Sequence, residues 1–248
     1  MCKVTVVRTQ HPNLRDPFSG QKLLNRFAEF QLFKLFGRLP RLALVVEKIG
    51  SNSNYSSWCR AKYGTIKRVK KREQIWELFI KELVPSKKTV VLEFGVAQGY
   101  STNWWNTKLR EVENQLFIIY GFDLFTGLPR SWRDAPAGEF DNGGRAPSIS
   151  SDNVHFVIGD VSETFHHNFL KKFNRDEIQL IVIFDLDLYE PTTSAIGVLK
   201  SYLDSGDLLW FDEAFDADER RVLDEGSFSL NDVRAIGCTA LGLGLQVN

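Results

Sequence analysis

The chain has 248 residues, 43% of them hydrophobic, which is enough to form the full core of one α/β domain with an N-terminal extension. Lys and Arg total 31, as do Asp and Glu, so no net charge draws the chain to nucleic acid or acidic lipid. Cys2, Cys59 and Cys238 have neither disulfide-framework nor metal-site spacing, which suits a reducing cytosol. A signal peptide and an apolar run of about 18 residues are both missing, so we expect a cytoplasmic protein without membrane insertion.

Residues 1–72 are predicted to form a helical extension or cap. Apolar residues recur near helical spacing at 21–36, a short helix is expected at 42–49, and a loop rich in Ser and Asn follows at 51–57. The basic segment 60–72 is expected to be a solvated face; a patch that steers an anionic substrate or contacts a membrane surface is the alternative. The helices before residue 73 either cap a site or pair two chains into a homodimer.

From residue 73 strands and helices alternate, which predicts a mostly parallel sheet with right-handed crossovers. A helix at 73–83 should precede the sheet, and two apolar segments at 233–238 and 241–247 should close it as an antiparallel hairpin. The other predicted elements are strands at 89–94, 115–122, 154–158, 179–184 and 208–211, and helices at 101–112, 162–173 and 192–203. The expected fold class is a Rossmann-like α/β fold whose seven-stranded, mostly parallel sheet is flanked by helices over 73–248.

A glycine turn between the first strand and its helix carries the most information. Residues 90–101 read Val-Val-Leu-Glu-Phe-Gly-Val-Ala-Gln-Gly-Tyr-Ser, the opening unit of a nucleotide-binding α/β fold. With Gln98 in place, the third glycine that seats a pyrophosphate is missing, which disfavours an NAD-linked oxidoreductase. S-adenosylmethionine is the commonest ligand without a pyrophosphate, so the turn predicts a methyltransferase. Glu93 would shape the loop around the methionine portion, and Ser101 would bind its carboxylate or cap the helix.

Two single aspartates end the next strands. Asp123, at the tip of the second predicted strand, is placed to accept hydrogen bonds from both ribose hydroxyls, or it is an ordinary turn residue. Asp160, after the third strand, either accepts the adenine amino group or caps a helix. Both are predicted cofactor contacts.

Acidic pairs follow the fourth and fifth strands, namely Asp185 with Asp187 and Asp212 with Glu213. The ends of adjacent parallel strands face one crevice, so these carboxylates should converge and repel one another unless a cation compensates. Mg²⁺ prefers oxygen ligands; it would lower the pKa of a substrate hydroxyl and orient the oxygen. Alternatively, Asp185 binds only the amino group of the cofactor, and the others cap helices.

Together these motifs resemble the class I S-adenosylmethionine-dependent methyltransferases, and among them the macrocin-type sugar O-methyltransferases. The resemblance covers about residues 73–247. Its most recognisable segment is Gly-Phe-Asp-Leu-Phe-Thr-Gly-Leu-Pro at 121–129, followed by Trp132. The other similar segments are 92–95 with 99–101, the glycine-rich loop 138–147, 185–192 and 211–213. The resemblance implies a metal at Asp185, Asp212 and Glu213 with Asp187 close by, although Glu213 stands where Asp or Asn is usual. The implied cofactor contacts are Gly95, Ser101, Asp123 and Asp160, and Gly99 and Tyr100 belong to the matched first motif.

The sequence therefore predicts an S-adenosylmethionine-dependent O-methyltransferase that acts on a hydroxyl of a small molecule, such as a sugar or glycosylated metabolite. Asp187 is its predicted catalytic residue, Mg²⁺ its predicted helper, and 125–153 its predicted substrate lid. Methylation of nucleic acid or protein is disfavoured, because an Asn/Asp-Pro-Pro-aromatic signature is missing. A non-catalytic cofactor-binding or partner-binding protein of the same fold is the alternative.

Overall fold

The computed structural model describes residues 40–113, 115–225 and 232–248. Contacts divide the chain into two units, Met1–Gly50 and Ser51–Asn248. The predicted helix at 21–36 lies outside the described residues. The functional division after residue 72, with a cap or a dimerisation segment before it, stays a prediction.

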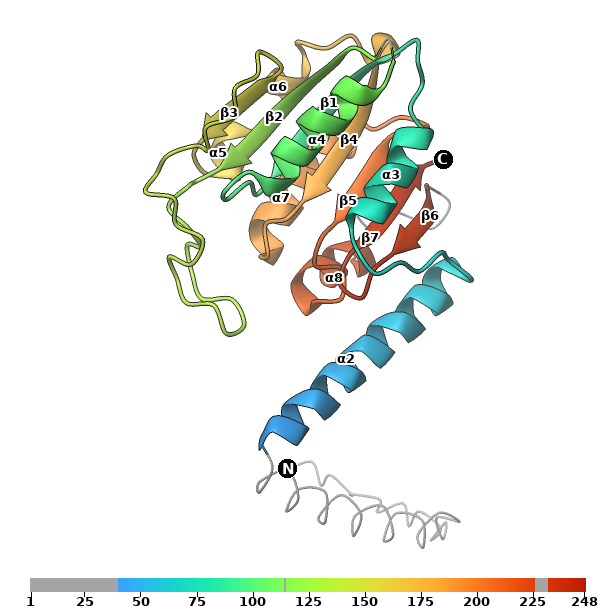
Figure 1. The fold of residues 1–248 in the computed structure, drawn as a ribbon, viewed down its shortest axis with the longest axis vertical. Coiled ribbons are helices and arrows are strands. Elements are labelled where there is room, and N and C mark those ends of the chain that lie inside the picture. Colours follow the sequence, from blue (N-terminus) through green and yellow to red (C-terminus); the bar gives the residue numbers. More distant parts are fainter. Residues whose placement is uncertain (1–39, 114, 226–231) are drawn as a thin grey trace, which may run out of the picture. The chain divides into compact units, whose positions relative to one another are not determined.

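A single seven-stranded sheet forms the centre of the second unit, in the order β3-β2-β1-β4-β5-β7-β6 (Figure 1). Strands β1 to β5 are parallel, and β7 runs antiparallel to both β5 and β6, which confirms the predicted fold class. The chain order reverses between β1 and β4, where doubly wound sheets open a crevice. The strands are β1 (Lys88–Phe94), β2 (Phe117–Asp123), β3 (Val154–Ile158), β4 (Ile178–Phe184), β5 (Leu208–Phe211), β6 (Val233–Cys238) and β7 (Leu243–Val247).

Helices cover both faces of the sheet. One face carries α3 (Glu73–Lys81) and α4 (Tyr100–Glu111), whose Trp76 and Trp105 pack near Trp210 of β5. The other face carries the remaining short helices, which are α5 (Val161–Thr164), α6 (His167–Leu170), α7 (Tyr189–Leu199) and α8 (Ala217–Asp224). A 3-10 turn, η1 (Arg175–Glu177), leads into β4.

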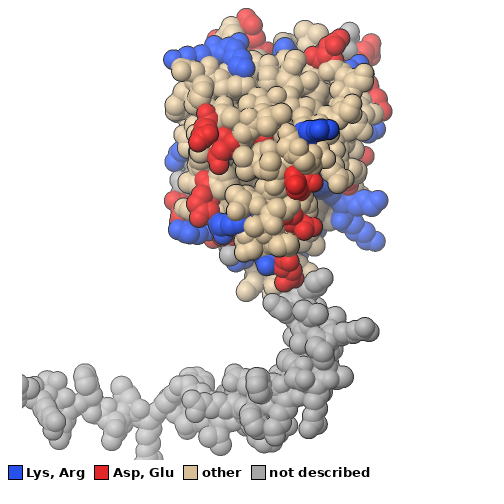
Figure 2. Space-filling view, turned by 90° about the vertical axis from the view of Figure 1, so that its left-hand side faces the viewer, with Lys and Arg blue, Asp and Glu red and all other residues tan. Residues whose placement is uncertain are grey.

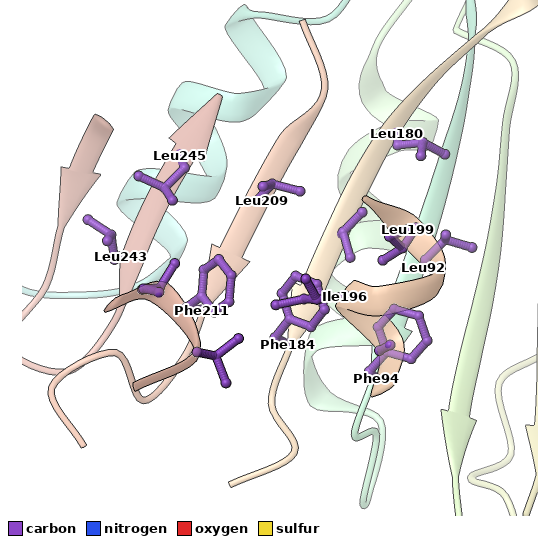
Figure 3. Close-up of a cluster of buried hydrophobic side chains, with 14 of the residues drawn as sticks. Leu92, Phe94, Leu180, Phe184, Ile196, Leu199, Leu209, Phe211, Leu243 and Leu245 are labelled. Carbon is purple, nitrogen blue, oxygen red and sulfur yellow. The ribbon is translucent and has the colours of Figure 1, made fainter. Parts of the chain in front are cut away.

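The core explains why the central strands read as apolar runs. All seven residues of β4 are buried, as expected for a parallel strand covered on both faces. Figure 3 shows Leu92, Phe94 and Phe184 of neighbouring strands packed beside Ile196 and Leu199 of α7. The aromatic rings of Phe94 and Phe184 stack with centroids 5.7 Å apart, directly beneath the strand ends that carry the acidic residues.

Helix α2 corrects the prediction of a loop at 51–57, because it runs without a break from Pro40 to Tyr63. Its residues from Ser51 on belong to the second unit. Tyr55 and Cys59, one helical turn apart, are buried, and Tyr55 Oη donates a hydrogen bond of 3.0 Å to the Gly242 carbonyl. Burial of this face outweighs the low helix propensity of Ser and Asn.

Two further elements differ from the prediction. The helix expected at 162–173 is broken into α5 and α6, because Phe165 takes an extended conformation and packs its ring against Phe94 and Phe122. Helix α8 was not predicted; Asp216 caps it by accepting from the Asp218 N–H at 3.0 Å. Among the described residues, none of the helices has the length and apolar character needed to span a membrane.

Candidate active site

A cleft of about 580 Å³ lies at the carboxyl ends of β1, β2, β4 and β5. Its walls are the β1–α4 turn, the end of β2, the loop that follows β2, and the acidic residues after β4 and β5. Both the volume and the position at the reversal of strand order are typical of sites for small molecules and cofactors.

The β1–α4 turn depends on Gly95, which has a φ of +86°. A Cβ atom at this position would lie 1.8 Å from the backbone oxygen of Asp185, so any side chain here would collide with the end of β4. The Gly95 N–H donates to the Phe122 carbonyl at 3.0 Å. The turn is thereby held against both neighbouring strands, and Gly95, Val96 and Ala97 line the cleft.

Asp123 closes this turn from the end of β2. Its Oδ2 accepts from the backbone N–H groups of Val96 (2.7 Å) and Ala97 (2.8 Å), and its Oδ1 accepts from that of Phe125 (2.7 Å). A carboxylate has about four acceptor positions, so roughly one is left for a ligand in the cleft that Asp123 also lines. The predicted contact with both hydroxyls of a ribose stays a prediction.

Asp160 caps α5, as one of its two interpretations predicted. Its Oδ1 accepts from Ser162 N at 2.8 Å and from Ser162 Oγ at 2.6 Å. The residue also lines the cleft, so its cap role and a contact with a bound ligand are geometrically compatible.

Four of the predicted cofactor contacts lie away from the lining of this cleft. Glu93 is fully buried and accepts from the hydroxyls of Ser101 and Thr102, so Ser101 is committed to the interior. Burial raises the pKa of Glu93 to about 7 despite these two donors. Tyr100 is 57% exposed and donates to Glu73 at 2.7 Å, and it lines, with Gly99, a separate depression formed by α4 and residues 147–149. Direct contact of these four with a ligand in the cleft has no support in this geometry.

The structure brings Asp185, Asp187, Asp212 and Glu213 to one side of the cleft. Backbone hydrogen bonds continue the sheet to them, from Asp185 N to the Phe94 carbonyl (2.8 Å) and from Asp212 N to the Phe184 carbonyl (3.0 Å). These two bonds place neighbouring strand ends side by side, which is why the acidic pairs meet.

Crowding of carboxylates shifts their protonation. Burial, followed by the charges of Asp212 and Asp187, raises the pKa of Asp185 well above its usual range. Burial and Asp212 raise the pKa of Asp187 to about 7 and that of Glu213 to about 8. Asp187 has a φ of +61° in a tight turn that the Leu188 N–H closes on the Leu186 carbonyl at 2.7 Å. Such a strained backbone is typical of functional positions.

The acidic cluster does not have the arrangement of the predicted metal site. Over the described ranges, no three side chains of the Asp, Glu, His and Cys type are placed so that they could hold one ion. Arg72 supplies a positive charge instead, because its Nη1 lies 2.9 Å from Asp212 Oδ1 and 3.6 Å from Asp185 Oδ2. Trp210 Nε1 donates to the same Asp212 oxygen at 2.8 Å. With Arg72 in this position the residues do not fit a metal ion as they stand, and a metal at Asp185, Asp212 and Glu213 stays a prediction.

Arg72 belongs to the segment 60–72, for which a solvated face is predicted, and no role is predicted for Glu219. Glu219 is fully buried in α8; its Oε2 accepts from Glu213 N at 2.9 Å, and its Oε1 has no hydrogen-bond partner. Burial, followed by the charge of Asp185, raises the pKa of Glu219 well above its usual range. Its position was detectable, because Val222 and Leu223 lie three and four residues further along the same helix face.

Two arginines tie the loop after β2 to the opposite wall. Arg133 Nε lies 3.0 Å from Asp216 Oδ2, and its Nη1 lies 3.6 Å from Glu213 Oε2. Arg130 lies 2.7 Å from Glu190 at the start of α7. The loop predicted to be a lid thus spans the cleft from β2 to α7 and α8.

No protein-family model matches the sequence, and no curated protein matches it. Similar solved structures include the calicheamicin methyltransferase CalS11 (24% identity, TM-score 0.55, covering 71% of this chain and 80% of that one). An apo structure described as CalS11, TDP-rhamnose 3'-O-methyltransferase, is 24% identical with a TM-score of 0.51, and the match covers 71% of this chain and 81% of that one. The O-methyltransferase NovP is 19% identical with a TM-score of 0.52, and the match covers 71% of this chain and 78% of that one. The chain therefore has the Rossmann-like fold of these methyltransferases.

Proposed function

We propose that the chain is an S-adenosylmethionine-dependent O-methyltransferase that acts on a hydroxyl group of a small molecule. The observation that carries this proposal is the shared cleft, which Asp123 at the end of β2 lines together with Asp185 and Asp187 after β4. The likeness in fold to known methyltransferases supports it.

The residues of the cleft fit the cofactor. The Val96–Ala97 turn and the remaining acceptor position of Asp123 would hold the ribose, and Asp160 lies at the same wall for the adenine. When bound, S-adenosylmethionine supplies an activated methyl group that an acceptor oxygen takes up as the hydroxyl loses its proton.

Asp187 is the proposed acceptor of that proton. It lines the cleft, and burial raises its pKa to about 7, so it is part ionised near neutral pH and able to hold a proton after the transfer. A general base is most effective when its pKa lies close to the working pH. Divalent-cation assistance, predicted from the sequence, has no support in this geometry, because Arg72 occupies the acidic cluster.

The acceptor is proposed to be a hydroxylated metabolite such as a sugar or glycosylated compound. Trp132 and Phe140 of the loop after β2 line the same cleft as the carboxylates, which offers both apolar ring surface and hydrogen-bond acceptors. Among the described residues on the face in Figure 2, basic and acidic side chains are interspersed and form no broad basic field. That distribution disfavours a nucleic-acid substrate.

The test is calorimetric titration of the full chain with S-adenosylhomocysteine. We expect a dissociation constant in the micromolar range for the wild-type chain and an affinity at least tenfold lower for Asp123→Ala. Asp134→Ala, at an exposed position of the loop after β2, should leave the affinity unchanged. No binding to the wild-type chain would overturn the proposal and favour a partner-binding protein. Binding without methyl transfer to any of a panel of hydroxylated acceptors would favour a non-catalytic cofactor-binding protein.

A further inference from the structure

We propose that Arg72 is a positioning residue that supplies, in place of a divalent cation, the positive charge at the acidic cluster of the cleft. This inference goes beyond the proposed function and is tested on the chain without cofactor or acceptor. Its failure and the failure of methyl transfer are therefore distinguishable.

The guanidinium of Arg72 is fixed in position by two aromatic rings. Arg72 immediately precedes α3, and its Cζ lies 5.1 Å from the ring centre of Trp76 and 5.3 Å from that of Tyr100. The Tyr100 hydroxyl is held in turn by Glu73, at 2.7 Å. A planar guanidinium that lies over aromatic rings presents its N–H groups as a rigid fork, which the flexible ammonium of a lysine does not.

The N–H groups of Arg72 reach the cluster. Arg72 Nη1 donates to Asp212 Oδ1 at 2.9 Å and approaches Asp185 Oδ2 at 3.6 Å, so one cation spans the ends of β4 and β5. After burial, the charge of Asp212 is the next cause that raises the pKa values of Asp185, Asp187 and Glu213. Arg72 thus pairs with the carboxylate that influences all the others.

A metal ion would have to displace this arrangement. Asp212 Oδ1 accepts from both Arg72 and Trp210, so two of its acceptor directions are filled. Mg²⁺ needs ligand oxygens at about 2.0–2.1 Å, and bringing it there would force two like charges together in a partly buried site. The guanidinium and the ion therefore exclude each other.

The experiment titrates the chain with Mn²⁺ as the probe and follows free Mn²⁺ by electron paramagnetic resonance. Wild type and Lys71→Gln, a neighbouring exposed lysine, are expected to show no saturable binding up to about 1 mM. Arg72→Gln, which removes the charge, is expected to bind one Mn²⁺ per chain and to gain thermal stability from it. Adding Asp212→Asn to that variant should abolish the binding.

Two results would overturn the proposal. One is saturable binding of Mn²⁺ by the wild-type chain that is lost in Asp212→Asn, and the other is a folded Arg72→Gln variant without a Mn²⁺ site. Should Arg72→Gln fail to fold, the wild-type titration decides alone, because binding contradicts the proposal and lack of binding supports it.

Discussion

Asp187 combines access to the cleft with a backbone conformation that fixes where its carboxylate lies. Its φ of +61° is unusual for a residue with a side chain, and the three-residue turn of which it is the centre is closed by a 2.7 Å hydrogen bond. The turn follows immediately on Asp185, whose backbone is still bonded to β1. The carboxylate of Asp187 is therefore positioned by the end of the sheet and not by a free loop.

Replacing Asp187 with Asn should lower the rate of methyl transfer by about 10²–10⁴-fold, because the amide cannot take a proton. The wild-type rate should rise as the pH increases through about 7, since the base works in its ionised form, and the variant should lose this rise. Initial rates from pH 6 to 8 would measure both effects, with Asp134→Asn as the control. A variant that keeps more than a tenth of the activity would remove Asp187 from this role, provided that its affinity for S-adenosylhomocysteine is unchanged.

Residues after strand ends were predictable, and residues that approach the site from elsewhere were not. Asp123, Asp185 and Asp212 each follow an apolar run, and parallel strands bring their ends together whatever the details of packing. Arg72 contacts Asp212, which lies 140 residues further along the chain, and the packing of α3 against Trp210 makes this contact possible. Such a contact cannot be predicted from local sequence patterns.

At the scale of the element, strands were predicted more accurately than the segments around them. The ranges 154–158, 208–211 and 233–238 agree with β3, β5 and β6, because short apolar runs between turn residues have clear limits. In α2 the polar sequence Ser-Asn-Ser-Asn suggested a loop, yet the helix continues through it to bury Tyr55 and Cys59. Tertiary burial decided that segment, and propensity alone could not show it.

Replacing Tyr55 with Phe tests whether residues 51–63 of α2, which belong to the second unit, are anchored there in this way. The change removes the 3.0 Å hydrogen bond to the Gly242 carbonyl and should lower the free energy of unfolding by about 1 kcal/mol. Urea unfolding followed by far-ultraviolet circular dichroism would measure the loss. Ser53→Ala, at an exposed position of the same helix, should leave stability within about 0.5 kcal/mol of wild type. Equal stabilities of the Tyr55 variant and wild type would contradict the anchoring contact.

At the scale of the whole molecule, acidic residues act on stability as well as on the site. The net charge is zero, yet Glu93 is buried and Asp187 and Glu213 are half-buried near the carboxyl ends of the strands, and each has a raised pKa. A carboxyl group whose pKa is higher in the folded chain than in the unfolded chain binds more protons when folded. Stability from this source is greatest below the unfolded pKa and decreases as the pH rises towards the folded value.

Glu93 allows this effect to be isolated, because it lies outside the cleft lining and bonds only within the interior at Ser101 and Thr102. The pKa of Glu93 is about 7, against an ordinary value of 4.5 for a glutamate. This shift predicts that the free energy of unfolding falls by about 2–3 kcal/mol between pH 5 and pH 8 through the ionisation of Glu93. Glu93→Gln keeps the shape of the side chain without the ionisation. Between pH 5 and pH 8 the free energy of unfolding of this variant should therefore fall by about 2–3 kcal/mol less than that of the wild-type chain. Glu111→Gln, at an exposed position on α4, should follow the wild-type curve. Urea unfolding at several pH values would give the curves, and parallel wild-type and Glu93→Gln curves would show that Glu93 ionises as freely in the folded chain as in the unfolded one.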